Sequence, residues 1–189
     1  LYKFVLANLA YKVMSLVMAK TILQVFAYSY AYGIYMFFDF AGYSLMAIGT
    51  GYMLGIKVPE NFNKPFISTD MKDFWARWHI SLSEWFRDFI FTRFIMSSMK
   101  KKRFKTRLTT ASVGFIINMF VMGIWHGLAI QYLVYGLYHG VLLALTEIYQ
   151  KKSKFHKKNK KKRWYKIVSW AITMNFVMFG FLIFSGHII

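Results

Sequence analysis

The chain has 189 residues, of which 57% are hydrophobic and 21% aromatic, and it carries a formal net charge of +18. A globule of this size cannot bury several uncharged runs of 17 residues or more, so the composition excludes a soluble protein. The absence of cysteine excludes a disulfide framework, a thiolate nucleophile and a cysteine metal site. We therefore expect an all-α fold, a polytopic transmembrane helical bundle that forms a single membrane domain over residues 1–189.

The first part of the chain is apolar and carries few charges. Leu1–Lys20 contains three lysines, so it is either the end of a span or an interfacial helix. Thr21–Phe38 is uncharged and long enough for one crossing, and a second uncharged run, Phe40–Ile56, follows Asp39. Asp39 is either a buried, paired acid at this junction or a residue at the end of a span. Lys57–Asp70 contains both prolines and is predicted to be a loop.

Met71–Met99 has a different pattern, in which aromatic residues recur at helical spacing among many charged residues. Asp70 is predicted to cap the start of this helix. Asp73 and Arg77 are spaced to form an ion pair on one helix face. So many charges disfavour a span that faces lipid. We therefore expect an amphipathic helix that lies in the membrane interface or re-enters against the other spans.

Leu108–Thr146 passes 39 residues without a Lys, Arg, Asp or Glu. As helix it would be about 58 Å long, close to two crossings of a ~30 Å hydrocarbon layer, which predicts a transmembrane hairpin. His126 lies in its middle, within the motif Gly-Ile-Trp-His-Gly. An ionisable residue inside a span is a functional candidate. His126 is therefore either a packing residue or a base that removes a proton from a hydroxyl. Ile167–Ile189 is predicted to span once more.

Two clusters, residues 100–107 and 151–166, hold sixteen of the 25 basic residues and flank the predicted hairpin. Basic runs can also bind nucleic acid, but beside membrane spans they favour loops that follow the positive-inside rule. A hairpin crosses the membrane an even number of times, so both clusters lie on one side. We expect both to be cytoplasmic, and we expect no nucleic-acid partner.

The other histidines are weaker candidates. His79 follows Trp78 on the predicted amphipathic helix, where an ordinary interfacial histidine is the competing interpretation. His139, His156 and His187 are expected to be incidental: a packing position, a solvated basic loop and a chain end. The histidine spacings do not form a metal-binding motif, so the sequence predicts no metal site.

Four motifs occur in the order seen in the membrane-bound O-acyltransferase family, which the chain resembles. The motifs are DFAGYSLMAIG from Asp39, PENFNKPF from Pro59, FWARWHISLSEWFRD from Phe74 and GIWHG from Gly123. The basic insert Met99–Arg107 is most similar to the D-alanyl teichoic acid transferase branch, and the alginate O-acetyltransferase branch shares the motifs. Family members are longer, so the chain resembles the C-terminal portion of such an enzyme.

The resemblance implies an activity and the residues that carry it. His126 matches the family's invariant histidine, and His79 matches its second active-site position. The donor would be D-alanine, held as a thioester on the phosphopantetheine arm of a small acidic carrier protein, so this chain itself would bind no cofactor. The acceptor would be a hydroxyl used for lipoteichoic acid D-alanylation. The setting would be the multi-pass membrane protein of a Gram-positive cell, with accessory membrane proteins of the same Dlt system.

A carrier-docking surface is also predicted, because an apolar patch borders the first basic cluster and an acidic carrier would be steered to it. Its residues are Ile95, Met96, Met99, Lys100, Lys101, Lys102 and Arg103. The alternative is that these lysines contact anionic lipid headgroups, which is our interpretation of the second cluster. Two other functions stay open: a proton-linked transporter or channel element, in which His126 relays protons, and a scaffold that recruits a cytoplasmic partner.

Overall fold

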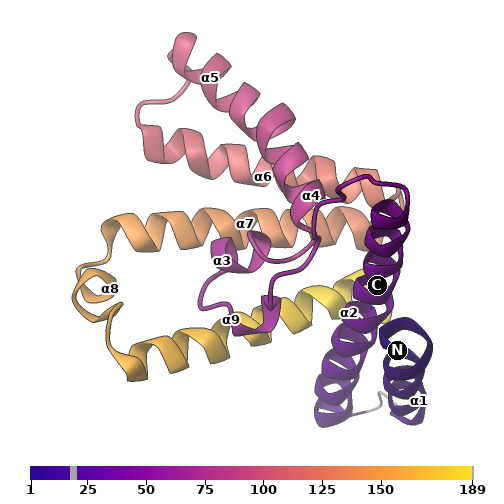
Figure 1. The fold of residues 1–189 in the computed structure, drawn as a ribbon. Coiled ribbons are helices and arrows are strands. Elements are labelled where there is room, and N and C mark those ends of the chain that lie inside the picture. The colour runs from indigo at the N-terminus through magenta and orange to yellow at the C-terminus, as the bar shows by residue number, and fades with distance from the viewer. Residues whose placement is uncertain (18–20, 189) are drawn as a thin grey trace.

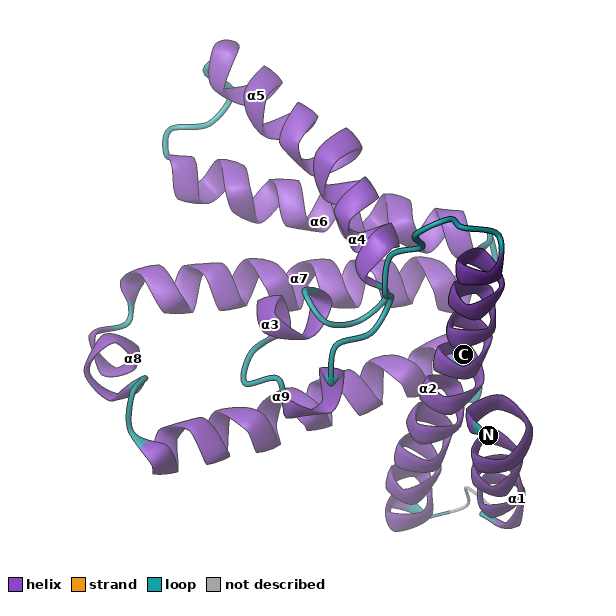
Figure 2. Ribbon diagram, in the orientation of Figure 1, coloured by secondary structure: helices purple, strands orange, loops and turns teal. Residues whose placement is uncertain are grey.

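The computed structural model describes residues 1–17 and 21–188, and this part of the chain consists of helices and loops without a strand. The helices are η1 (Tyr2–Leu6), α1 (Ala7–Leu16), α2 (Ile22–Met53), η2 (Pro65–Ile67), α3 (Met71–Trp75), α4 (Ile80–Phe86), η3 (Arg87–Phe91), α5 (Thr92–Lys100), α6 (Arg107–His126), α7 (Ile130–Lys152), α8 (Lys154–Asn159) and α9 (Arg163–Phe184). In Figure 1, α6 and α7 lie side by side, α8 joins α7 to α9, and α1 and α2 cross the opposite end. Figure 2 shows the same all-helical architecture. The predicted all-α class is confirmed for the described residues.

α2 is a single helix of 32 residues, so the predicted junction at Asp39 is wrong. Thr21 caps it, since its side chain accepts a hydrogen bond from the Gln24 backbone and the Gln24 side chain accepts one in return. Asp39 lies within the helix and forms an ion pair with Lys3 at 2.5 Å. The helix continues through Asp39 because a cation from another segment compensates the carboxylate. Lys20, one of the three lysines noted in the first segment, lies outside the described residues.

The predicted hairpin is present as α6 and α7, joined by a turn over residues 127–129. Thr106 begins α6 by accepting a hydrogen bond from the Thr109 backbone at 3.0 Å. The two helices approach through glycines: a Cβ at Gly136 would lie 2.5 Å from the Met119 carbonyl oxygen, and one at Gly123 would overlap the Tyr132 carbonyl. Small residues allow such close backbone packing.

Two helices among the described residues, α6 and α9, are long and apolar enough to cross a membrane. α9 begins four residues before the last predicted span, Ile167–Ile189, and covers it as far as Phe184, while Ile189 lies outside the described residues. The crossings predicted for α2 and α7 stay predictions, as does the multi-pass topology.

The segment Met71–Met99 is not one helix, contrary to expectation. Asp70 does cap α3, where its side chain accepts hydrogen bonds from the Lys72 and Asp73 backbones, and Arg77 does pair with Asp73 at 2.7 Å. The chain then leaves the helix, and α4, η3 and α5 continue as a second helical run to Lys100. The cause of the break is His79, whose backbone adopts the left-handed conformation with φ of 46°.

The core surrounds α3 and fixes its position against α7 and α9. The ring of Trp78 stacks on that of Phe74, with ring centroids 5.7 Å apart, and its centroid is 4.9 Å from that of Phe181 on α9. The indole N–H of Trp75 donates to Nδ1 of the fully buried His139 on α7 at 3.3 Å. Lys72 pairs with Glu147, also on α7, at 2.7 Å. The turn that carries His79 is therefore attached to the rigid part of the molecule.

Candidate active site

His126 is the last residue of α6 and lies at the turn of the hairpin. The helix ends there because Gly127 has φ of 149°, a backbone conformation that a side chain rarely adopts. A Cβ at Gly127 would also lie 2.9 Å from the ring of Tyr132. The half-buried imidazole of His126 lies edge-on to Phe184 of α9, with ring centroids 5.0 Å apart. The position of His126 is thus fixed by α6, which carries it, and by side chains of α7 and α9 that lie next to its ring.

His79 lies on a turn held by Asn61 from the preceding loop. The Asn61 side-chain oxygen accepts hydrogen bonds from the Ser81 hydroxyl at 2.6 Å and the Ser81 backbone at 3.2 Å, and its carbonyl accepts one from the Ile80 backbone. The Asn61 amide donates to the hydroxyl of Ser44 on α2 at 3.1 Å. A left-handed backbone at a residue other than glycine costs about 1–2 kcal/mol, and these bonds offset that cost.

Trp125 is a common neighbour of the two histidines. Its ring centroid is 4.8 Å from that of His126 and 6.3 Å from that of His79, whose other neighbour is Phe40 at 4.5 Å. His79 lies outside the two candidate spans. Burial, and to a smaller extent the charge of a protonated His126, lower the pKa of His79 to about 4. His79 is therefore neutral near pH 7, with one N–H available as a donor. Among the described residues no side-chain hydrogen bond to either imidazole is seen, which leaves both rings available to a substrate.

A cleft of about 330 Å³ has α4 and η3 on one side and the α6–α7 hairpin on the other. It is lined by Ile80, next to His79, and by Met122, one turn before His126. Farther along it is lined by Arg87 and Phe91, and Asn118 on α6 faces it with a buried side-chain oxygen that has no partner among the described groups. A buried amide oxygen left without a hydrogen bond is unfavourable, so this atom is suited to accept one from a ligand.

The predicted docking residues lie on α5 and on the turn that follows it, at the far end of that helical run from His79. Met96 and Met99 are 64% and 47% exposed, while Ile95 is half-buried against α6 beside Gly114. Lys100–Arg103 are exposed, and Figure 1 shows α5 diverging from α6. At 1.5 Å per residue, the run from Ile80 to Lys100 is about 30 Å long, so this patch is remote from the two histidines.

The other candidates are separate from this site. His139 is enclosed in the core, His156 accepts or donates a hydrogen bond with the Tyr165 hydroxyl at 2.9 Å, and His187 stacks on Tyr28 at 4.3 Å. Within residues 1–17 and 21–188, no group of three or more His, Cys, Asp or Glu is placed to hold a metal ion.

Comparison with known proteins places this geometry in context. The model of the membrane-bound O-acyltransferase family matches residues 2–188. The chain belongs to this family. It is 49% identical over 98% of its length to the teichoic acid D-alanyltransferase of Bacillus subtilis (strain 168), of which it covers 48%. It is 49% identical over 84% of its length to the enzyme of that name from Streptococcus thermophilus, of which it covers 40%.

A more distant relative is a probable alginate O-acetylase of Pseudomonas fluorescens. It is 40% identical over 83% of this chain, which covers 29% of that protein. The chain thus spans about half, or less, of the length of the curated relatives it matches. For this member of the membrane-bound O-acyltransferase family, the expected resemblance to the teichoic acid branch is confirmed.

Sequence reasoning missed Asn61 and Phe40, two residues that shape the site of this acyltransferase-family chain, and it identified Trp125 only as the sequence neighbour of His126. Asn61 appeared only as a loop residue, although its place in the motif PENFNKPF was a usable signal. Trp125 and Phe40 border the two histidines from different helices. Their contacts with His79 depend on how α2 and the hairpin turn each pack against the α3–α4 break, and local spacing contains no information about that packing.

Proposed function

We propose that this chain forms the catalytic part of a membrane acyltransferase that moves D-alanine from a carrier-protein thioester to a hydroxyl acceptor for lipoteichoic acid. Two kinds of finding support this: the family membership, and the names of the relatives that are 49% identical. The observation that carries the proposal is the placement of His79 and His126 around one tryptophan, with both imidazoles available. A Gram-positive cell membrane is the corresponding location.

The proposed reaction needs no covalent enzyme intermediate. Neutral His126 removes the proton of the acceptor hydroxyl as its oxygen attacks the thioester carbonyl carbon. The carbonyl oxygen becomes negatively charged, and the N–H of neutral His79 donates a hydrogen bond to it. Collapse of this intermediate breaks the carbon–sulfur bond, and the departing thiolate takes the proton back from His126. The products are the D-alanyl ester and the free carrier thiol, so atoms and charge balance.

The donor arm would reach this site through the cleft between α4, η3 and the hairpin. The carrier would dock on the exposed methionines of α5 and on Lys100–Arg103, where an acidic protein is attracted electrostatically. Its phosphopantetheine arm contains amide N–H groups, and the unpartnered oxygen of Asn118 could accept from one of them. The cleft borders Phe91 on the docking side and Ile80 on the histidine side, which supports this route.

In the membrane we propose a multi-pass bundle with the loops 100–107 and 151–166 on the cytoplasmic side. The candidate span α6 begins at Arg107 and ends at His126, so about 30 Å of helix separates the first basic loop from the proposed base. The run α4–η3–α5 would lie at the interface or re-enter. Its exposed Trp85 and Phe89 beside Arg87 and Asp88 support that placement.

The test is transfer of D-alanine from loaded carrier protein in membranes that contain the full-length enzyme. We expect His126→Ala to abolish transfer while membrane insertion and carrier binding are retained. We expect His79→Ala to lower kcat by about 10²–10³, the usual cost of removing one oxyanion donor. His187→Ala is the matched control, because this exposed histidine lies outside the site. Normal transfer by His126→Ala would overturn the proposal and favour the scaffold or transporter interpretations.

The relationship to the alginate O-acetylase makes polysaccharide O-acetylation the second candidate. The same membranes, supplied with an acetyl donor and a soluble polysaccharide acceptor, distinguish the two. Transfer of acetyl but not D-alanyl groups would assign the chain to that branch.

A further inference from the structure

A second cavity lies away from the two histidines, between the C-terminal part of α7, α8 and the first half of α9. Its volume is about 760 Å³. α7 and α9 touch at one end, where the Tyr138 hydroxyl donates to the Phe176 carbonyl at 2.9 Å and Gly180 makes room for His139. The helices separate toward α8, as Figure 1 shows, and the cavity occupies the space that opens between them.

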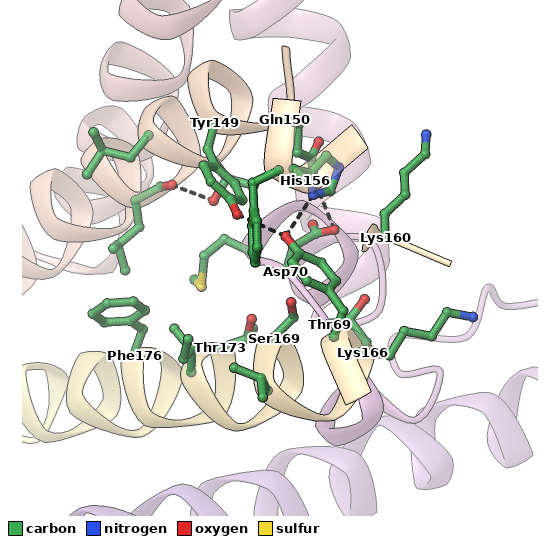
Figure 3. Close-up of a pocket in the computed structure, with 18 of the residues that line it drawn as sticks. Thr69, Asp70, Tyr149, Gln150, His156, Lys160, Lys166, Ser169, Thr173 and Phe176 are labelled. Atoms are coloured by element: carbon green, nitrogen blue, oxygen red, sulfur yellow. Dashed lines mark hydrogen bonds between the residues drawn. The ribbon is translucent and has the colours of Figure 1, made fainter. Parts of the chain in front are cut away.

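The cavity has a polar end and an apolar end. In Figure 3, Lys160 and Lys166 lie at one end, and Phe176 lies at the other. Leu142 and Ile172 add to the apolar wall. Lys166 and Phe176 are ten residues apart on α9, which is about 15 Å of helix. That is half the thickness of a ~30 Å hydrocarbon layer, the depth of one lipid leaflet.

The polar end carries a net positive charge. Lys160 and Lys166 line it, and the one carboxylate among the lining residues, Asp70, is already engaged. One Asp70 oxygen accepts from the Lys72 and Asp73 backbones at 2.9 Å, and the other accepts from the Gln150 amide at 3.0 Å. In Figure 3 the side chains of Lys160 and Lys166 point outward from this end of the cavity and away from each other, with Asp70 farther inside. Both side chains are long and flexible, so their ammonium groups can turn toward a phosphate at the cavity mouth without bringing it to the carboxylate.

We propose that this cavity binds one anionic phospholipid from the leaflet on the side of the basic loops. Its phosphate lies at Lys160 and Lys166, and one acyl chain runs along the apolar wall toward Phe176. A free anion would use only the cationic end, and an uncharged alkyl chain only the apolar end. The site combines the two at the spacing of a lipid. The inference rests on the proposed membrane insertion of α9, and it does not depend on acyl transfer.

The experiment uses the full-length protein in neutral detergent, titrated with phosphatidylglycerol while native mass spectrometry counts bound lipids. Replacing both cavity lysines, as Lys160→Gln with Lys166→Gln, should remove one bound lipid and weaken its binding roughly 30-fold. That corresponds to about 1 kcal/mol for each lysine. The matched control is Lys157→Gln with Lys161→Gln, which removes the same charge from residues that do not line the cavity. It should retain the lipid.

Further arms separate the possible occupants. Phosphatidylcholine should bind more weakly than phosphatidylglycerol, and inorganic phosphate should not displace the lipid. Ile172→Trp fills the apolar wall from a side chain that is 53% exposed, so the fold should tolerate it while the lipid is lost. Equal loss in the control pair, full displacement by phosphate, or unchanged binding in both Lys160→Gln/Lys166→Gln and Ile172→Trp would overturn the inference. His126→Ala should keep the lipid while losing transfer, which separates this inference from the proposed function.

Discussion

The most informative perturbation of the site is Asn61→Ala, because Asn61 holds the His79 turn without itself contacting a substrate in the proposed reaction. The substitution removes three side-chain hydrogen bonds, two to Ser81 and one to Ser44. It leaves the bond from the Ile80 backbone to the Asn61 carbonyl intact. The fold should persist while the turn loses the contacts that specify its shape.

The magnitude follows from the left-handed backbone of His79. Each lost hydrogen bond is worth about 0.5–1.5 kcal/mol, so the three together are worth about 3 kcal/mol. The left-handed conformation costs about 1–2 kcal/mol, so the remaining contacts no longer clearly favour it. A loss of about 3 kcal/mol corresponds to roughly a hundredfold smaller population of the correct turn, since 1.4 kcal/mol is tenfold. We therefore expect kcat for D-alanine transfer to fall about 10- to 100-fold.

The assay measures transfer at varied carrier concentrations in membranes, so that kcat and KM for the carrier are obtained separately. The KM should change little, because the docking residues lie at the other end of the α4–α5 run. Asn63→Ala is the control, since this exposed neighbour uses only its backbone in hydrogen bonds, to the Arg77 carbonyl and side chain. If Asn61→Ala stays within twofold of wild type in kcat, the positioning argument is wrong.

Three further predictions test other parts of the structure. Burial lowers the pKa of His79 to about 4, so the stability present above about pH 6.5 is lost as the pH falls toward 4 and the unfolded chain binds the proton more readily. His79→Gln should therefore reduce the change of melting temperature between about pH 6.5 and 4, and an unchanged pH dependence would contradict the burial of His79. Gly123→Ala should lower the melting temperature, because the added Cβ forces α6 away from α7. Gly49→Ala is the control, since no atom of another described segment lies within 4 Å of its added Cβ, and equal effects of the two substitutions would refute the close packing of α6 on α7. Lys101→Glu with Arg103→Glu should raise the carrier KM, more at low salt, with kcat unchanged; an unaltered KM at low salt would remove the docking surface.

Local chemistry explains which parts of the fold could be predicted from the sequence. The uncharged run from Leu108 predicted the helical hairpin, and the acid before Met71 predicted the cap of α3, because neighbouring residues determine both. The continuity of α2 could not be predicted in this way, because the ion-pair partner of Asp39 is Lys3, 36 residues away. The break at His79 likewise depends on Asn61 from another segment.

The same distinction applies to the candidate site. Both histidines were identified from composition and from the resemblance, because an ionisable residue stands out in an apolar run. Their common neighbour Trp125 was noticed only as adjacent to His126 in the sequence. Its contact with His79 depends on the packing of the hairpin turn beside the α3–α4 break, which becomes evident only in three dimensions.

The position of His126 at the last residue of α6 has a consequence for how this family can vary. The helix starts at the basic loop and ends at the proposed base, so its residue count sets the height of the reaction above that loop. One inserted residue would raise the imidazole by about 1.5 Å and turn it by about 100° away from Trp125. Insertions and deletions in α6 should therefore be rarer than substitutions, because each one changes both the height and the direction of the imidazole.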